Sequence, residues 1–348
     1  MHESNAASFT GLVDLAAAEL GGKALTASDD FFAGVENLIK PGRAVFIADK
    51  YTDRGKWMDG WESRRKRVAG YDHCILELGV PGHVLGLDID TQHFLGNHPP
   101  FASLDGVLAA PGTGLAELEQ APWRTLLPQV PLRPGSQNLF AAERGEAVSH
   151  VRLNIFPDGG VARLRVYGKV QPSAAGAAAP REDDALVSKH VPEGLWDLAA
   201  MKNGGLALAC SDAFFGPMNN LLLPGRAANM GGGWETRRKR APGHDWILVQ
   251  LAQRGRVSVL ELDTNHFKGN YPDRASVELI DAPGARITDL IASSAFVPLL
   301  AQTPLRADTR HFYARELSAH APATHLRLNI FPDGGVSRLR AWGTRETS

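Results

Sequence analysis

The sequence predicts an all-β protein built as a tandem repeat of two jelly-roll β-sandwich domains. Two observations lead to this prediction. One half of the chain returns in the other half, and each half consists of short apolar segments of strand length separated by turns rich in glycine and proline. Helical periodicity is sparse and is limited to pieces such as residues 13–20. Many short strands with such turns are typical of β-sandwiches, and of the jelly roll in particular.

The duplication rests on three blocks that occur in both halves. They are RLNIFPDGGVARLR at 152–165 with RLNIFPDGGVSRLR at 327–340, GWESRRKR at 60–67 with GWETRRKR at 233–240, and residues 90–97 with residues 263–270. The last two pairs lie 173 residues apart, whereas residues 37–43 match residues 220–226 at a distance of 183. The first copy therefore carries ten extra residues, which lie within residues 44–59.

The repeat also predicts the domain organisation. We expect a first domain over residues 1–170 and a second domain over residues 191–348. Residues 171–190 are rich in alanine and proline and contain an acidic run, which is the composition of a linker.

Two local features are predicted inside the first copy. Residues 73–78 and 84–89 are apolar runs, which we expect to be two strands joined by a glycine turn. Residues 152–155 and 161–167 are expected to pair as a hairpin around the Phe-Pro-Asp-Gly-Gly turn at 156–160.

Composition excludes several classes of protein. Hydrophobic residues make up 44% and charged residues 22% of the 348 residues, and the net charge is −1. This balance is typical of a globular protein and gives no general attraction to nucleic acid or an anionic membrane. We find no apolar run long enough to span a membrane and no secretory signal. The cysteines, Cys74 and Cys210, occupy different positions of the repeat and are expected to be small buried residues, which favours the cytoplasm.

The Gly-Trp-Glu block carries a candidate acid or base. Glu62 is followed by Arg64, Arg65 and Arg67, which should hold its carboxylate in the ionised form. The arginines could also bind a substrate carboxylate in a bidentate manner. The structural alternative, an ion-paired loop, is about equally favoured for any one arginine.

The block at residues 90–97 carries a second polar constellation. Asp90 and His93 could transfer a proton or supply two metal ligands, but no third ligand can be named from the sequence. Alternatively, Asp90 and Thr91 cap a turn while His93 bonds a backbone carbonyl, and the spacing alone favours this structural role. Arg152 is a further candidate for binding an anion.

Four segments together resemble the allantoicase family. They are LGGKALTASDDFF at 20–32, GKWMDGWE at 55–62, DTQHFLGN at 90–97 and NIFPDGG at 154–160, and the second copy repeats most of them. The resemblance covers nearly the whole chain outside the linker and the termini. It implies a hydrolase of purine (allantoin) degradation that converts allantoate and water to ureidoglycolate and urea. The fold it implies is a pair of jelly rolls similar to galactose-binding modules.

The two copies differ from this pattern to different degrees. The second copy has Asn-Met-Gly-Gly at 229–232, where the first copy has Lys-Trp-Met-Asp at 56–59. Since the second copy lacks this lysine and aspartate, the first copy is expected to be the catalytic half.

The substrate suggests roles for these residues, because allantoate carries one carboxylate and two ureido groups. We expect Glu62 or Asp59 to act as acid or base, His93 to transfer a second proton, and Arg65 or Arg152 to hold the carboxylate. The remaining expected substrate-binding residues are Lys56, Asp90, Thr91, Asn97 and Asn154 in the first copy and Glu235, Arg238, Asp263 and His266 in the second.

Two other functions are compatible with the sequence. One is a non-catalytic β-sandwich that binds small anions or carbohydrates, for which Trp57, Trp61 and Trp234 could serve as exposed aromatic residues. The other is a hydrolase of a related ureido compound. No cofactor is firmly predicted, and a divalent metal is left open. The expected partner is allantoate, with no nucleic acid and no membrane, and we expect the chain to form a homo-oligomer.

Overall fold

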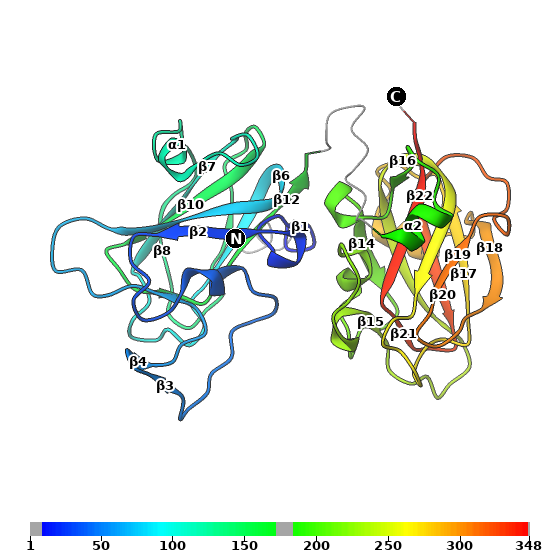
Figure 1. The fold of residues 1–348 in the computed structure, drawn as a ribbon, viewed down its shortest axis with the longest axis horizontal. Coiled ribbons are helices and arrows are strands. Elements are labelled where there is room, and N and C mark those ends of the chain that lie inside the picture. The colour runs from blue at the N-terminus through cyan, green and yellow to red at the C-terminus, as the bar shows by residue number, and fades with distance from the viewer. Residues whose placement is uncertain (1–8, 172–183, 347–348) are drawn as a thin grey trace. The chain divides into compact units, whose positions relative to one another are not determined.

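The computed structural model describes residues 9–171 and 184–346, and the chain divides into two compact units, residues 1–171 and 172–348 (Figure 1). Most of the predicted linker, residues 172–183, lies outside the described residues. Its last six residues instead form α2 (Ala185–His190), whose N-terminus is capped by the side chain of Asp184. Val187 of this helix packs against Val259 of the second unit.

The regular secondary structure of the first unit consists mainly of strands. They are β1 (Val13–Asp14), β2 (Lys23–Ala27), β3 (Tyr51–Thr52), β4 (Gly55–Lys56), β5 (Trp61–Glu62), β6 (Asp72–Asp90), β7 (Phe101–Val107), β8 (Arg124–Pro131), β9 (Leu139–Ala141), β10 (Val148–Phe156), β11 (Gly160–Val161) and β12 (Arg163–Val170). The helical pieces are α1 (Leu115–Glu119) and two 3₁₀ turns at Ala18–Leu20 and Val35–Ile39.

The strand β6 belongs to both layers of the sandwich. Its first half pairs with β2 and β10, and β10 continues through β7 to β8. Its second half pairs with β9 and β12, and β12 continues to β1. The changeover lies at Gly82, which pairs with both Val148 of β10 and Val170 of β12. A strand that passes from one sheet to the other in this way forms the corner of a β-sandwich.

Two local predictions were therefore wrong. The runs at 73–78 and 84–89 are parts of one continuous strand, so Gly82 marks a change of partner and not a turn. The strands β10 and β12 do not pair with each other, because each lies beside a different half of β6. The segment at 156–160 thus connects the two layers.

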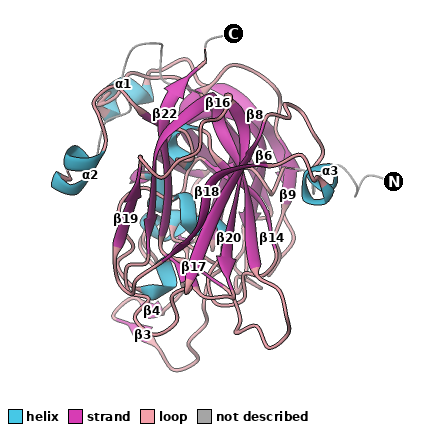
Figure 2. Cartoon of the chain, turned by 90° about the vertical axis from the view of Figure 1, so that its right-hand side faces the viewer, coloured by secondary structure: helices cyan, strands magenta, loops and turns pink. Residues whose placement is uncertain are grey.

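The second unit repeats this arrangement. Its strands are β13 (Trp196–Asp197), β14 (Leu206–Cys210), β15 (Trp234–Glu235), β16 (Asp245–Asp263), β17 (Arg274–Ile280), β18 (Val297–Pro304), β19 (Arg310–Tyr313), β20 (Ala323–Phe331), β21 (Gly335–Val336) and β22 (Arg338–Arg345). Besides α2, its helical pieces are α3 (Ile287–Ala292) and 3₁₀ turns at Met201–Asn203, Met218–Leu222 and Met230–Gly232. The strand β16 takes the place of β6, and Figure 2 shows that strands predominate over helices.

The pairing register of β2 with β6 is the same as that of β14 with β16. Ala27 lies opposite Cys74 in the first unit, and Cys210 lies opposite Ile247 in the second. The two cysteines therefore occupy the two sides of one repeated strand pair. Both are free; Cys74 is buried as expected, but Cys210 is only partly buried. The prediction of an all-β tandem repeat of antiparallel sandwiches is confirmed.

The three repeated blocks meet in the core of each unit. In the first unit β5 pairs with β11, and the ring of Phe94 is fully buried beside them. A Cβ atom added to Gly60 or Gly160 would overlap this ring. The same relationship holds between Phe267 and the glycines at 233 and 335. Close packing against one phenylalanine thus explains why glycine recurs at these positions.

Candidate functional site

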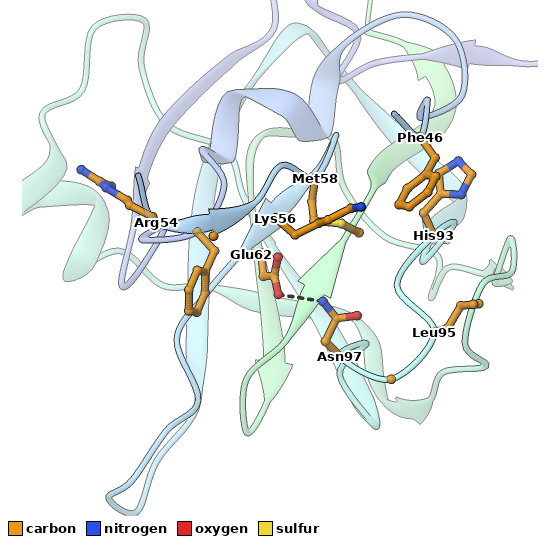
Figure 3. Close-up of a pocket in the computed structure, with 11 residues that line it drawn as sticks. Phe46, Arg54, Lys56, Met58, Glu62, His93, Leu95 and Asn97 are labelled. Carbon is orange, nitrogen blue, oxygen red and sulfur yellow. Dashed lines mark hydrogen bonds between the residues drawn. The ribbon is translucent and has the colours of Figure 1, made fainter. Parts of the chain in front are cut away.

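The first unit contains a pocket of about 550 Å³ beside β5. It is lined by Phe32, Phe46, Arg54, Gly55, Lys56, Met58, Glu62, His93, Leu95, Gly96 and Asn97. Four of the residues predicted for the site, Lys56, Glu62, His93 and Asn97, therefore lie around one cavity (Figure 3). They come from two repeated blocks and from the end of the insert.

The insert at residues 44–59 builds one wall of this pocket. It contributes Phe46, Arg54, Gly55, Lys56 and Met58, the last four from the short hairpin β3–β4 and the residues that follow it. The corresponding segment of the second unit, residues 227–232, has the sequence AANMGG and contains no cationic residue. The insert therefore gives the first unit a cationic wall that the second unit lacks.

Glu62 is half-buried at the end of β5. Its Oε1 accepts a hydrogen bond of 2.7 Å from the side-chain amide of Asn97 (Figure 3). Burial raises the pKa of the Glu62 carboxyl, and the hydrogen bond from Asn97 opposes this effect only in part. Among the described residues no ion pair joins Glu62 to an arginine: Arg64 binds Asp29 at 2.7 Å, and Arg65 and Arg67 are exposed. The expected pairing of Glu62 with these arginines is therefore not found in the structure.

His93 has a positive φ of 70°, a conformation that non-glycine residues rarely adopt. Its Nε2 lies 3.2 Å from the carbonyl oxygen of Ala44, the first residue of the insert. Because a carbonyl can only accept, Nε2 is the donor in this contact, and the tautomer with its proton on Nε2 has Nδ1 as the acceptor. The ring of Phe46 lies beside the imidazole, with the centroids 5.6 Å apart (Figure 3).

Lys56 extends into the same space as Glu62 (Figure 3). Its ammonium group lies 4.9 Å from the ring centroids of both Phe46 and Tyr51 and donates a hydrogen bond to the carbonyl of Ala48. It forms no ion pair with any carboxylate of residues 9–171 or 184–346. A lysine stabilised by rings and a carbonyl keeps its positive charge available to an anion.

Arg54 lies at the rim of the pocket, and its guanidinium group points away from Glu62 (Figure 3). The group donates a hydrogen bond of 3.1 Å to the carbonyl of Phe31. It also lies 5.0 Å from the centroid of the Phe31 ring. Arg54 therefore joins the insert to the residues before β5.

Asp59 does not line the pocket. It is 8% exposed, and its Oδ2 accepts hydrogen bonds from the backbone of Val45 at 2.9 Å and from Arg163 at 2.7 Å. Burial alone would raise the pKa of Asp59, but the hydrogen bonds from Arg163 and Val45 outweigh it and hold the pKa below its ordinary value. The carboxylate is thus enclosed and ionised.

Asp90 and Thr91 are also absent from the pocket lining, contrary to expectation. Asp90 forms an ion pair of 3.1 Å with Arg43 and accepts a hydrogen bond from the backbone of Gln92. The hydroxyl of Thr91 is fully buried and donates to the carbonyl of Arg133 at 2.6 Å. These two residues have the structural role that their spacing favoured.

Arg152 and Asn154 lie on β10, where both bind Asp105 of β7 at 3.0 Å. The guanidinium group of Arg152 also lies 5.1 Å from the ring centroid of Trp123. Neither residue lines the pocket. The structure therefore brings none of the predicted arginines to the site.

The second unit keeps part of the constellation. Glu235 accepts a hydrogen bond of 2.5 Å from Asn270, and His266, again with φ of 70°, lies 2.9 Å from the carbonyl of Ala227. Asp263 is fully buried and pairs with Arg226 at 3.0 Å. The side chain of Arg238 is exposed. The polar pair is therefore repeated without the wall supplied by the insert.

Two of the three tryptophans suggested as a platform for a sugar ring are buried. Trp61 and Trp234 are fully buried, and their indole N–H groups donate to the carbonyls of Asp29 and Asp212. Trp57 is covered by the ammonium group of Lys50, which lies 3.8 Å from the centroid of its ring. The suggestion that these residues form an exposed aromatic surface was wrong for Trp61 and Trp234.

Within residues 9–171 and 184–346, no three His, Cys, Asp or Glu side chains lie close enough to hold a metal ion. In the same part of the chain, no helix is both long and apolar enough to cross a membrane.

Sequence reasoning missed several lining residues, namely Phe32, Phe46, Arg54, Met58 and Leu95. Three of them belong to the insert, whose position was already evident from the change in repeat offset. An insertion next to repeated polar residues was therefore the signal that could have identified this wall of the pocket.

Comparison with known proteins gives a consistent result. The profile of the allantoicase repeat matches residues 13–171 and again residues 196–346. The chain is 48% identical to "Probable allantoicase 1" of Burkholderia mallei over 99% of this chain and 98% of that protein. It is 45% identical to "Probable allantoicase" of Acinetobacter baylyi, over 97% and 95% of the two chains. The crystal structure of allantoicase from Saccharomyces cerevisiae matches with a TM-score of 0.79 and 34% identity, over 95% of this chain and 93% of that chain.

Proposed function

The chain belongs to the allantoicase family and hydrolyses allantoate to ureidoglycolate and urea, and we propose that the pocket of the first repeat is the site of this reaction. One observation carries the proposal. The hydrogen-bonded pair of Glu62 and Asn97 faces the same cavity as the unneutralised Lys56. This combination offers a proton donor and an anion receptor within one small space.

The lining suits the parts of allantoate. The substrate carries a carboxylate, for which the ammonium group of Lys56 is the receptor in this proposal. It also carries two ureido groups, which both donate and accept hydrogen bonds. The amide of Asn97 and the carboxyl of Glu62 can bind such groups. Lys56 thereby takes the role that the sequence suggested for Arg65 or Arg152.

The reaction replaces a C–N bond at the central carbon of allantoate by a C–O bond. The leaving nitrogen must gain a proton to depart as urea, and the attacking water must lose one. We assign the first transfer to Glu62, whose burial raises its pKa and so favours the protonated form. We assign the second to His93, whose Nδ1 is an acceptor while Nε2 donates to Ala44.

Asp59 is the less suitable of the two residues predicted to act as acid or base. Its carboxylate is enclosed by Val45 and Arg163, and its pKa is lowered, so it is neither exposed to a substrate in the pocket nor ready to donate a proton. We therefore keep the acid role for Glu62 alone.

The test compares Glu62→Gln with Glu235→Gln, because the two glutamates accept the same hydrogen bond in the two repeats. Urea release from allantoate should fall by about 10²-fold or more in the first variant, as expected for a lost proton donor. It should remain near the wild-type rate in the second. Near-normal release by Glu62→Gln would refute the role of Glu62, and equal losses in both variants would refute a site confined to the first repeat.

A homo-oligomer and a cytoplasmic location stay predictions. Size-exclusion chromatography with light scattering tests the oligomer, and fractionation of the source cells tests the location.

A further inference from the structure

The two ends of the insert are joined at its base. Val45 at its beginning donates its backbone N–H to Asp59 at its end, over a distance of 2.9 Å. Between them most side chains are exposed, including Val45, Phe46 and Tyr51 at 50–67%. A loop of this length whose ends meet and whose tip has few buried contacts depends on its base for its conformation.

One carboxylate oxygen links the two ends of the insert to the sandwich. Oδ2 of Asp59 accepts both the N–H of Val45 and Nη2 of Arg163, the latter at 2.7 Å. Arg163 reaches this position from β12, which belongs to the rigid sandwich, and its Nη1 also donates to the backbone carbonyl of Asp59. Both side chains of the ion pair are almost completely buried, at 4% and 8% exposure. Buried charge-assisted hydrogen bonds of this kind are among the stronger polar interactions in proteins.

Apolar contacts support the same base. Ala44 and Met58, at the two ends of the insert, are buried in one cluster with Ala33, Phe94 and Ala162. The base of the insert is therefore packed against the ring on which the repeated blocks converge, while the hairpin β3–β4 extends from it.

The second repeat has no carboxylate at the position of Asp59, which allows the two repeats to be compared. There Arg338 occupies the place of Arg163, and its Nη1 donates to the carbonyl of Gly232 as that of Arg163 does to the carbonyl of Asp59. Gly232 has no side chain, and the short segment before it is a single 3₁₀ turn, Met230–Gly232. The carboxylate of Asp59 is thus present in the repeat that contains the long insert, and the repeat with the short segment has glycine in its place.

From these contacts we propose that Asp59 is a positioning residue, which closes the base of the insert and thereby fixes Lys56 and Phe46 in the wall of the pocket. The proposal rests on the proposed function insofar as Lys56 binds the substrate carboxylate. Asp59 itself touches no substrate, so its loss should weaken binding more than it slows the chemical step.

The experiment compares Asp59→Ala, Asp59→Asn and the control Asp49→Ala. Asn can keep its oxygen in the place of Oδ2 and so retain both hydrogen bonds, but it cannot transfer a proton. Asp49 is an exposed carboxylate in the same insert, so its removal controls for the change of charge. The readouts are kcat and KM for allantoate, the pH profile of kcat, and the rate at which trypsin cuts after Lys50, Arg54 or Lys56, followed by mass spectrometry.

Asp59→Ala should raise KM and the rate of cleavage in the insert by about tenfold each, with a smaller fall in kcat. Asp59→Asn, which keeps the accepting oxygen but loses the charge, should raise KM and cleavage less than Asp59→Ala does and should keep both limbs of the pH profile. Asp49→Ala should match the wild type in all readouts. The proposal is overturned if Asp59→Asn abolishes activity or removes a limb of the pH profile, since Asp59 would then be an acid or base. It is equally overturned if Asp59→Ala leaves both KM and cleavage unchanged. Should the wild type release no urea, the proposed function fails, whereas the cleavage rates still decide whether Asp59 closes the insert.

Discussion

The side-chain amide of Asn97 donates a hydrogen bond of 2.7 Å to the carboxylate of Glu62, and the two residues belong to different repeated blocks of the first unit. Asn270 and Glu235 form the same bond in the second unit. The bond links β5 to the loop after β6, so it has a structural role in both units. Only in the first unit does the insert add a cationic wall to the pair.

Replacing Asn97 by alanine should change the pH dependence of the reaction. Burial raises the pKa of Glu62 and the bond from Asn97 lowers it, so removing the bond raises the pKa further. If Glu62 acts in its protonated form, the alkaline limb of kcat/KM moves to higher pH by about one unit. Measuring urea release between pH 5 and pH 10 checks this. Asn270→Ala is the matched control, and a limb that stays in place or moves to lower pH contradicts the assignment.

Replacing Lys56 by methionine should weaken substrate binding. The variant keeps the apolar stem between Phe46 and Tyr51 but removes the charge. KM for allantoate should rise by about 10- to 100-fold, with a smaller change in kcat, because a charge-assisted bond to the substrate carboxylate is lost. The control is Lys50→Met, which removes an ammonium group stacked on Trp57 outside the pocket. An unchanged KM in Lys56→Met would mean that another group binds the carboxylate.

Replacing residues 44–59 by the shorter segment 227–232 should abolish urea release. The exchange removes five lining residues at once while leaving β5, β6 and their partners intact. The circular dichroism spectrum should therefore stay that of the wild type, and unfolding should remain cooperative. Full activity in this chimaera would show that the asymmetry between the two repeats has no role in catalysis.

Replacing Asp88 by asparagine should stabilise the protein at neutral and alkaline pH. Burial raises the pKa of Asp88 from 3.8 to about 6, against the hydrogen bond from Gln137. Between these values the unfolded chain loses its proton before the folded one does, so the wild type loses stability as the pH rises from about 4 to 6. Asparagine does not ionise, so the variant does not lose stability over this pH range. Its unfolding free energy should exceed that of the wild type by about 1–3 kcal/mol at pH 8 and by little at pH 4.

Urea denaturation at the two pH values measures the difference, with the exposed Asp49→Asn as control. A stabilisation that is greatest at pH 4 would contradict the assigned direction of the shift.

The duplication could be predicted because it depends on blocks of identical residues in the two halves of the chain. The all-β class followed from short apolar segments separated by Gly/Pro turns, and the family followed from four segments that resemble it. The same identities grouped Glu62, His93 and Asn97 correctly, since all three belong to blocks that converge on Phe94. The insert was visible as a change of offset, and Lys56 with it.

The role of Asp59 and the distant partners of Asp90 and Thr91 could not be predicted, because each of these contacts joins segments far apart in the chain. Asp59 binds Arg163, which lies 104 residues later, and the hydroxyl of Thr91 donates to a carbonyl 42 residues later. A buried, satisfied polar residue and an exposed reactive one look alike in a sequence. The same applies to β6, because a glycine at which a strand changes partners resembles a glycine in a turn.

Arg338 has a consequence for engineering. It presents a guanidinium group beside the backbone of Gly232, as Arg163 does beside Asp59. A graft of residues 44–59 between Arg226 and Gly233 would place its terminal aspartate next to this arginine and its lysine near Glu235 and Asn270. The second repeat therefore already contains the arginine and the Glu–Asn pair beside which the transplanted loop would lie.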